Sequence, residues 1–348
     1  MIKLGFIGVG NMGQAAHLRN YAALSDCTVV ALAELRESTG QLVAQRYNVP
    51  RVYRTHTELL ANEPLDGIVC IQLFTRYGQL IPEILRIGIP VLTEKPLAAT
   101  LEMGQRIVQA ARENNTWHMV GYHKRSDPAT LSAKTEIDQL KHTGELGKLR
   151  YVRITMPPGD WIAGGFNDVL NAGDPMPSLP DDPPPSDMSA EAFKDYVRFV
   201  NYYIHQVNLM RHLLGEPYRL THVDRADVLL VCQSASGITG TIEMAPYHTT
   251  QDWQESALVA FERGYVRLDF PAPLTHNRAG QVTIFRDSGN GAQPQTTVPT
   301  LPPVHAMRQQ AIHFVRALKG EMLPLCDSVE ALEDLRIARE YIRLKWGE

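Results

Sequence analysis

The sequence predicts an α/β protein in which an N-terminal, doubly wound parallel sheet precedes an α/β domain with an open antiparallel sheet. Short β-branched runs alternate with amphipathic stretches through the first third of the chain, and a glycine-rich turn follows the first run. After about Tyr122, strand-like runs follow one another without intervening helices. A length of 348 residues suits two domains, which we place at residues 1–122 and 123–348.

In the first domain, apolar runs separated by helical periodicity predict five parallel strands joined by right-handed crossovers. We expect strands at Lys3–Ile7, Thr28–Ala33, Gly67–Ile71, Pro90–Thr93 and Trp117–Gly121, and helices at Gly13–Leu24, Ser38–Tyr47, Tyr77–Ile87 and Leu101–Asn114.

In the second domain, a helix at Pro128–His142 is followed by runs joined by short turns such as Glu262-Arg263-Gly264, which indicate antiparallel pairing. A final amphipathic helix is expected at Ser328–Lys345, with Ser328 as its N-cap. The predicted strand regions are Lys148–Met156, Leu220–Gln233, Gly237–Met244, Ser256–Phe270 and Gln281–Arg286.

The composition favours a small-molecule partner. With 44% hydrophobic and 21% charged residues and a net charge of −4, the chain shows no basic footprint for nucleic acid or an anionic membrane. No apolar run is long enough for a transmembrane helix, and the opening residues are interpreted as a strand and not as a signal peptide. Four scattered cysteines predict no metal site and fit a cytoplasmic protein with reduced thiols.

Gly8-Val9-Gly10-Asn11-Met12-Gly13 forms a GxGxxG motif between the first strand and the first helix. In that context the first glycine permits a tight turn, the second lets backbone approach a pyrophosphate, and the third allows close packing of helix on strand. The amides at the helix start then favour an anion. The motif predicts a dinucleotide-binding Rossmann domain.

Glu34 lies 21 residues after Gly13, at the end of the second strand. An acidic residue there accepts hydrogen bonds from the ribose hydroxyls of the adenosine and repels a 2′-phosphate, so NAD is preferred over NADP. Arg36 lies two residues further on and could partner a phosphate, which leaves NADP open as an alternative.

Glu94-Lys95-Pro96-Leu97-Ala98 follows the fourth strand, Gly121 to Pro128 reads GYHKRSDP, and Leu213 to Pro217 reads LLGEP. With the glycine motif, these segments resemble the Gfo/Idh/MocA family, named after glucose-fructose oxidoreductase, inositol dehydrogenase and a rhizopine catabolism protein. The resemblance covers essentially the whole chain. It implies a sugar or polyol oxidoreductase with its active site between two domains, and often a homo-oligomer, here a dimer or tetramer.

The resemblance also implies site residues. Lys95 lies at the carboxyl edge of the sheet beside the nicotinamide, where its ammonium can orient the reacting hydroxyl and stabilise a developing alkoxide. The implied cofactor contacts are Gly8, Gly10, Asn11, Met12, Gly13, Glu34, Arg36, Ile71, Gln72, Leu73, Glu94, Lys95, Pro96 and His123.

The helical run from Phe199 to Leu209 resembles the family's D-x-x-x-H-x-x-D helix, and its spacing places Asn201, His205 and Asn208 on one face. His205 matches the family's proton acceptor. Asn201 and Asn208 depart from the acidic family pattern, since an amide can position a hydroxyl but cannot take a proton. Either His205 acts alone as the base or the chemistry differs from ordinary alcohol oxidation.

Other positions depart from the family or extend the site. Gln72-Leu73 and Tyr77 replace a Thr-Pro pair and a later histidine, so the nicotinamide surroundings are expected to be atypical. Lys124 is expected to line the substrate pocket, and Trp161 is placed where it could stack on a sugar ring.

The segment Gly173–Met188 contains six prolines and four aspartates, so it is predicted to be a loop. It is either a surface insertion or a lid or wall over the substrate pocket.

Together these features predict an NAD-dependent oxidoreductase of a sugar, polyol or sugar derivative that requires no metal. Three alternatives stay open. One is an NAD-dependent glycoside hydrolase or lyase that acts through transient sugar oxidation, and another is a non-catalytic NAD- and sugar-binding regulator. The third is a reductase of a non-sugar substrate that shares the fold.

Overall fold

A computed structural model describes residues 1–247, 249–289 and 291–347 and divides into two compact units. Unit 1 gathers three separate segments, residues 1–122, 165–201 and 307–336. Unit 2 contains residues 123–164, 202–306 and 337–348. The helix α7 (Ala190–Leu214) begins in unit 1 and ends in unit 2. The predicted α/β class, with a parallel sheet followed by a mainly antiparallel one, is confirmed.

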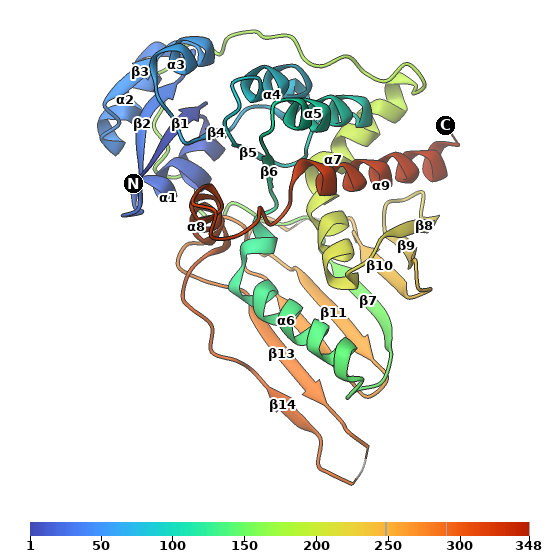
Figure 1. The fold of residues 1–348 in the computed structure, drawn as a ribbon. Helices are drawn as coiled ribbons and strands as arrows, with labels where there is room; N and C mark the ends of the chain where they lie inside the picture. The colour runs from blue at the N-terminus through green and yellow to red at the C-terminus, as the bar shows by residue number, and fades with distance from the viewer. Residues whose placement is uncertain (248, 290, 348) are drawn as a thin grey trace. The chain divides into compact units, whose positions relative to one another are not determined.

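Unit 1 is built on a six-stranded parallel sheet in the order β3-β2-β1-β4-β5-β6, in which the strand order reverses at β1 (Figure 1). The central strands are buried along their length because helices flank the sheet, which explains their continuous apolar runs. The strands are β1 (Ile2–Ile7), β2 (Cys27–Ala33), β3 (Arg51–Tyr53), β4 (Gly67–Cys70), β5 (Val91–Glu94) and β6 (His118–Gly121).

The helices of unit 1 include two that the sequence analysis did not predict. The helix α3 follows a capping box in which Thr55 and Glu58 bond each other's backbone, and α8 comes from the C-terminal part of the chain. The helical elements are η1 (Gly13–Leu18), α1 (Arg19–Ala22), α2 (Glu37–Tyr47), α3 (His56–Asn62), η2 (Phe74–Arg76), α4 (Tyr77–Leu85), α5 (Leu101–Glu113), α8 (Ala306–Leu318) and the start of α9 (Ser328–Trp346).

Three sequence predictions need correction, on the number of strands, the first helix and the cap of the last helix. A sixth strand, β3, escaped prediction because it is only three residues long and none of them is buried. The first helix is not regular, since Gly13–Leu18 forms a π-helix before α1. Ser328 is the first residue of α9 and not its cap, because Asp327 accepts the Glu330 amide at 2.8 Å.

Unit 2 carries an eight-stranded sheet in the order β14-β13-β12-β11-β7-β10-β9-β8. Every pair is antiparallel except β7 with β10. The helix α6 lies along β12 and β13 (Figure 1). The elements are η3 (His123–Ser126), α6 (Pro128–Thr143), β7 (Leu149–Thr155), β8 (Tyr218–Val223), β9 (Leu229–Ser234), β10 (Thr239–Glu243), β11 (Ser256–Phe261), β12 (Gly264–Asp269), β13 (Gln281–Arg286) and β14 (Gln295–Thr297).

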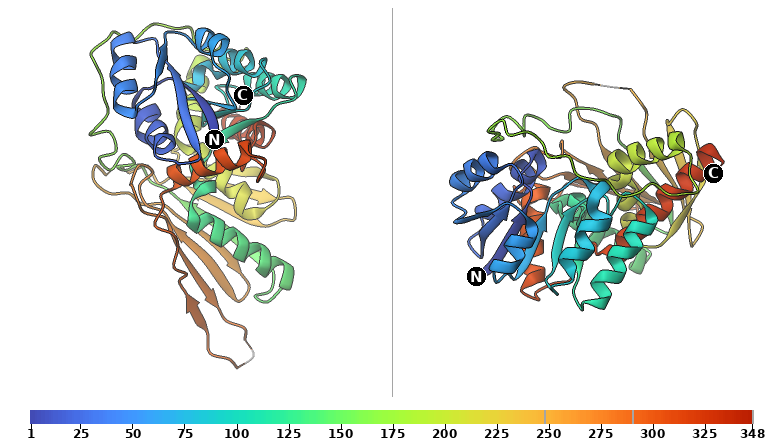
Figure 2. Two further views of the ribbon diagram at one scale, coloured as in Figure 1. Left: turned by 60° about the vertical axis from the view of Figure 1, so that its left-hand side comes forward. Right: turned by 90° about the horizontal axis from the view of Figure 1, so that it is seen from above.

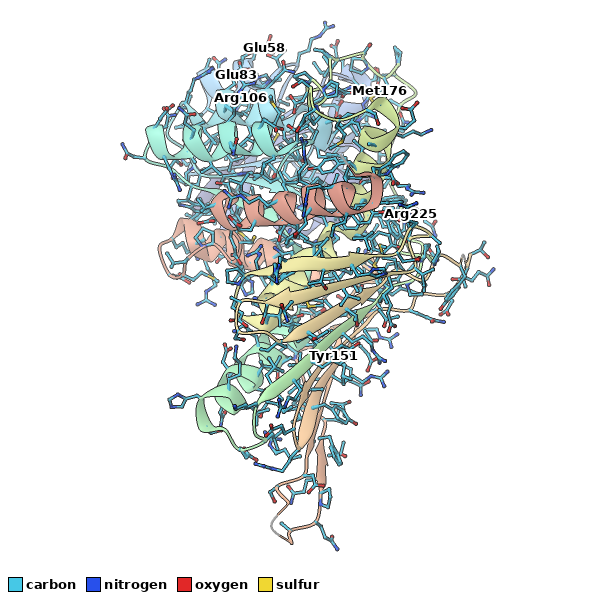
Figure 3. The ribbon with its side chains drawn as sticks, turned by 90° about the vertical axis from the view of Figure 1, so that its right-hand side faces the viewer. Glu58, Glu83, Arg106, Tyr151, Met176 and Arg225 are labelled. Atoms are coloured by element: carbon cyan, nitrogen blue, oxygen red, sulfur yellow. The ribbon has the colours of Figure 1, made fainter. Side chains whose placement is uncertain are left out.

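The region predicted as one strand at Leu220–Gln233 is two strands, β8 and β9. They are joined by a turn in which the Asp227 amide donates to the Asp224 carbonyl at 3.1 Å, and Arg225, labelled in Figure 3, lies in this turn. Asp227 adopts a φ of 60°, a left-handed conformation that aspartate tolerates. The turn was not predicted because the polar stretch that interrupts this apolar run is short.

The core of unit 1 depends on α8. Phe314 is fully buried, and its ring meets Tyr21 at 6.3 Å and Trp117 at 5.6 Å, both in edge-to-face geometry. Figure 2 shows α8 beside the first strands of unit 1. A helix encoded near the C-terminus therefore completes the hydrophobic core of the N-terminal sheet.

We expect Phe314→Ala to lower the free energy of unfolding by about 3–5 kcal/mol, because it leaves a cavity lined by Tyr21 and Trp117. Denaturant titration followed by Trp117 fluorescence measures this. Arg316→Ala, on the same helix with its side chain 47% exposed, is the control and should change the value by about 0.5 kcal/mol or less. Equal effects of the two variants would contradict a core role for α8.

Candidate functional site

The turn after β1 requires glycine at two positions. Gly8 has a φ of 90°, and a Cβ there would lie 2.3 Å from the carbonyl oxygen of Ile71. A Cβ on Gly13 would lie 2.4 Å from the carbonyl oxygen of Gly8. At Gly10, by contrast, a Cβ would meet no described atom within 4 Å. The turn therefore packs tightly beneath Gly8 and Gly13 and leaves open space at Gly10, as a bound pyrophosphate requires.

The helix that starts in this turn is fixed by Gln14. Its amide donates to the Gly10 carbonyl at 3.0 Å, and its side chain donates to the Val9 carbonyl at 2.7 Å. Asn11 is exposed and Met12 is half-buried at the helix start. The positive end of the helix dipole thus lies beside the open space at Gly10, where it favours an anion.

Glu34 follows β2 and is already engaged in hydrogen bonds. Its carboxylate accepts the Val9 amide at 3.0 Å and two bonds from the Arg36 guanidinium at 2.8 and 3.0 Å. Burial opposes the charge, but these hydrogen bonds outweigh it and lower the pKa of Glu34. The structure therefore places an ionised carboxylate next to the glycine turn, with Arg36 neutralised against it.

The segment after β4 borders the same turn. Ile71 is buried, Leu73 is 58% exposed, and the Gln72 side chain lies against Gly8. Tyr77 is fully buried, and its hydroxyl lies 3.4 Å from both the Gln72 amide and the Cys70 carbonyl. Burial raises the pKa of Tyr77 well above its ordinary value, so this phenol stays neutral.

Glu94 ends β5 and is paired with a residue that sequence reasoning missed. His17 Nε2 lies 2.7 Å from Glu94 Oε1, and both side chains are buried. The Lys95 amide donates to the second Glu94 oxygen at 3.2 Å, and the Lys95–Pro96 peptide is cis. The position of His17, four residues after Gly13 on the first helix, was the available signal.

The Lys95 side chain reaches α7. Its ammonium donates to the Asn201 carbonyl oxygen at 2.5 Å, and the Asn201 side chain is exposed. In α-helical geometry, this same carbonyl accepts the amide of His205, one turn further along. The structure thus links Lys95 to the turn of α7 that precedes His205.

His205 contacts another predicted site residue, His123. The two rings lie 4.5 Å apart between centroids, edge to face, and both belong to unit 2. Asn208, three residues further along α7, is buried and accepts a hydrogen bond from Arg125 at 2.7 Å. Asn208 therefore holds the GYHKRSDP segment in place.

Lys124 is buried in an ion pair that includes a second missed residue. Its ammonium lies 3.0 Å from Glu255, whose side chain is fully buried and also accepts from Gln206 at 2.6 Å. The ammonium also lies 5.9 Å from the centre of the Phe270 ring. An acidic residue immediately before the apolar strand β11 was the only sequence signal for Glu255.

Trp161 lies half-buried in the turn after β7. Its amide donates to the Gly159 carbonyl at 3.0 Å, and its carbonyl accepts from Leu274 at 3.3 Å. Nearby Tyr202 has a raised pKa, mainly because it is buried, and the Gly159 backbone bonds it. Two backbone hydrogen bonds therefore fix the position of Trp161 in the chain.

A hollow of about 280 Å³, including space open to solvent, lies within unit 2 next to the GYHKRSDP segment. Asp127 at its edge accepts the Ala129 and Gly280 amides, and burial raises its pKa to about 6. The hollow is lined by His123, Lys124, Asp127, Phe270, Pro271, Ala272, Pro273, Thr275, Arg278, His305 and Ala306.

The predicted residues fall into two groups. Unit 1 contains the glycine turn, Glu34, Arg36, Ile71 to Leu73, Glu94 to Pro96 and Asn201, and unit 2 contains His123, Lys124, Trp161 and His205. No cluster of three or more His, Cys, Asp or Glu side chains in the described ranges could hold a metal ion. None of the helices described is long and apolar enough to cross a membrane.

Residues 2–122 match the model of the Gfo/Idh/MocA family, described as an oxidoreductase family with an NAD-binding Rossmann fold. This N-terminal domain therefore belongs to the Gfo/Idh/MocA family of NAD-binding Rossmann domains.

Inositol dehydrogenases are among the proteins that are similar to this chain. Inositol 2-dehydrogenase of Rhizobium meliloti (strain 1021) is 26% identical over 48% of this chain, and the match spans about half, 51%, of that relative. Inositol 2-dehydrogenase 2 of Saccharopolyspora erythraea is 26% identical over 80% of this chain and 76% of its own.

Among solved structures, the aldose-aldose oxidoreductase of Caulobacter crescentus complexed with glycerol is 18% identical, with a TM-score of 0.71. The superposition covers 99% of this chain and 97% of that one. This likeness shows that the two proteins share a fold across both units.

We expect the protein to bind NAD more tightly than NADP, and Glu34→Ala to reduce that preference by about tenfold or more. The variant removes a carboxylate that repels the 2′-phosphate and releases Arg36 to meet it. Titration with each dinucleotide gives the affinities, and Glu37→Gln, an exposed carboxylate at the start of α2, is the control. Tighter binding of NADP by the unaltered protein would show that Arg36 governs the site.

Proposed function

We propose that this protein is an NAD-dependent oxidoreductase that acts on a CH–OH group of a sugar, polyol or sugar derivative. The observation that carries the proposal is the hydrogen bond from the Lys95 ammonium to the Asn201 carbonyl. It brings the family's EKP lysine to the helix that carries the histidine expected to accept the proton.

The first turn of unit 1 fits the dinucleotide. Gly10 leaves its backbone open, the helix start favours the pyrophosphate, and the Glu34 carboxylate lies where a ribose hydroxyl can donate to it. When bound, NAD supplies the hydride acceptor for the oxidation.

Lys95 has the role of orienting the reacting oxygen. Its peptide follows β5 at the carboxyl edge of the sheet, and its ammonium carries further hydrogens besides the one given to Asn201. A fixed ammonium stabilises the negative charge that develops on the substrate oxygen as its proton leaves.

His205 has the role of the general base. An imidazole accepts a proton near neutral pH, and His205 is only half-buried on α7. The edge-to-face contact with His123 at 4.5 Å restricts the orientation of its ring. Asn201 is exposed one turn earlier on the same helix, where its amide can bind a neighbouring hydroxyl but cannot share the proton.

The substrate class rests on the relatives and on the residues of unit 2. The relatives named above are inositol dehydrogenases, and inositol is a polyol. Trp161 offers an aromatic face for a ring, and Lys124, which lines the hollow of unit 2, is held in place by Glu255.

Asn201 favours one alternative, an NAD-dependent hydrolase or lyase that oxidises the sugar only transiently. An asparagine at this position leaves His205 without the acidic neighbour of the family pattern. Absorbance at the nicotinamide band separates the two activities. A net oxidoreductase reduces NAD in proportion to product, whereas the hydrolase leaves it unchanged overall.

We expect Lys95→Met to retain NAD affinity while turnover falls by about 10²-fold or more, the scale of losing one charge-stabilising donor in a fixed site. NAD titration and steady-state kinetics on a panel of polyols and sugars measure the two effects separately. Lys319→Met, which removes a surface ion pair with Asp26, is the control. Turnover within a few-fold of the unaltered protein would exclude Lys95 from catalysis.

We expect His205→Ala to lower turnover by about 10²- to 10⁴-fold and to remove its pH dependence near neutrality. Asn201→Ala should mainly raise KM, whereas Asn201→Asp places a carboxylate one turn from the imidazole and favours its protonated form. The acid limb of the pH–rate profile should therefore move to higher pH in the Asp variant. If the acid limb does not move in Asn201→Asp and His205→Ala stays active, His205 is not the base. Tyr122 and Tyr202 would then be the next residues to test.

A further inference from the structure

A carboxylate from a distant part of the chain occupies the start of α2. Asp174 Oδ2 accepts the Thr39 amide at 2.7 Å and the Thr39 hydroxyl at 2.6 Å, and Oδ1 accepts the Ser38 amide at 3.3 Å. These two amides lie in the first turn of α2, and Arg36 at the N-cap position makes no side-chain capping bond. Asp174 therefore supplies the cap that the local sequence lacks.

The donors that Asp174 occupies are those that would bind a phosphate. Two helix-start amides, a hydroxyl and the helix dipole together favour an anion. The bond from the Thr39 hydroxyl is the largest of several that lower the pKa of Asp174 to about 2, so the group is ionised at neutral pH. An anion site is thus present, and the protein's own carboxylate fills it.

This anion site lies beside the position expected for the adenosine ribose. Glu34, the expected ribose acceptor, directly follows β2, and Ser38 and Thr39 lie a few residues later in the first turn of α2. Arg36 is hydrogen-bonded to Glu34 and is also within reach of the charge of Asp174. Its pKa is raised, first by its hydrogen bonds to Glu34 and in part by the charge of Asp174. The guanidinium of this turn is therefore already engaged by Glu34 and stabilised by the charge of Asp174.

Asp174 belongs to a strap, residues 168–182, that is fastened to unit 1 along its length. Near its start, Gln14 exchanges two hydrogen bonds with the Leu170 backbone, both at 2.9 Å. At its end, the Asp182 amide donates to the Thr75 carbonyl at 2.6 Å, and its carboxylate accepts the Gly78 amide at 2.8 Å.

Figure 1 shows the chain between these anchors running over unit 1 toward α7, and Met176, labelled in Figure 3, stands exposed on it. All of these anchors lie in unit 1. The strap therefore holds Asp174 in a defined place.

We infer that Asp174 is a specificity-determining residue, which excludes a 2′-phosphorylated dinucleotide by occupying the donors of Ser38 and Thr39 that its phosphate would need. The inference rests on the proposed use of NAD and deepens it. A 2′-phosphate entering this turn meets the Asp174 charge in addition to that of Glu34, and finds the helix-start amides already bonded. NAD carries only a hydroxyl at that position, from which Glu34 can accept a hydrogen bond, so its binding is unaffected.

Asp174→Asn tests this with little change of shape, because the amide oxygen can still accept from Thr39. Titration of the full chain with NAD and with NADP, followed by calorimetry, measures both affinities. We expect NADP affinity to rise by about tenfold or more, the scale of removing a like-charge contact, with NAD affinity changed by less than about threefold. Asp174→Lys, which adds a cation at the same place, should raise NADP affinity further.

Asp181→Asn is the matched control, because it removes a strap carboxylate that bonds Thr75 and Arg76, away from α2. It should leave the ratio of the two affinities unchanged. NADP affinity that does not rise in either Asp174 variant, while both still bind NAD, would overturn the inference. So would an equal rise in Asp181→Asn, since the effect would then come from loosening the strap.

These outcomes are distinct from failure of the proposed function. If the unaltered protein binds neither dinucleotide, the proposed cofactor is wrong. If it binds NAD and the Asp174 variants behave like it toward NADP, the cofactor stands and the role of Asp174 falls.

Discussion

The close backbone approach at the first turn is the constraint on which the rest of unit 1 depends. Because Gly8 and Gly13 lack side chains, the end of β1, the start of the first helix and the segment after β4 meet within van der Waals distance. That contact fixes where the helix-start amides point, and it places Glu34, Gln72 and the EKP segment around one edge of the sheet. A larger side chain at either glycine would separate the elements that carry the candidate site.

Elements with a strong local signal could be predicted from the sequence. Apolar runs predict the buried strands β1, β2, β4, β5 and β6. Helical periodicity predicts α6 and α9. The short strand β3 has no buried residue and gave no such signal. The helix α3 did carry one that we overlooked, the Thr55-x-x-Glu58 capping box. The helix α8 depends on packing against residues made far earlier in the chain.

The candidate site shows the same division. The glycine turn, Glu34, Lys95 and His205 follow from motifs at fixed spacing, and the structure brings each to the element expected for it. Partners joined only by the fold could not be found this way. Asp174 lies 135 residues from Thr39, and nothing in either local sequence connects them. The proline-rich segment Gly173–Met188 was expected to be a loop, as it is, but the attachment of the strap to unit 1 through carboxylates and backbone depends on tertiary contacts.

The division of unit 1 into three chain segments has a consequence for biosynthesis. A ribosome releases residues 1–122 well before Phe314, about 190 residues later, is made. At translation rates of about 5–20 residues per second, the nascent sheet waits roughly 10–40 s with the faces of Tyr21 and Trp117 uncovered. The first domain in the sequence is thus among the last to be completed, and its exposed aromatic surface is the kind that chaperones bind during synthesis.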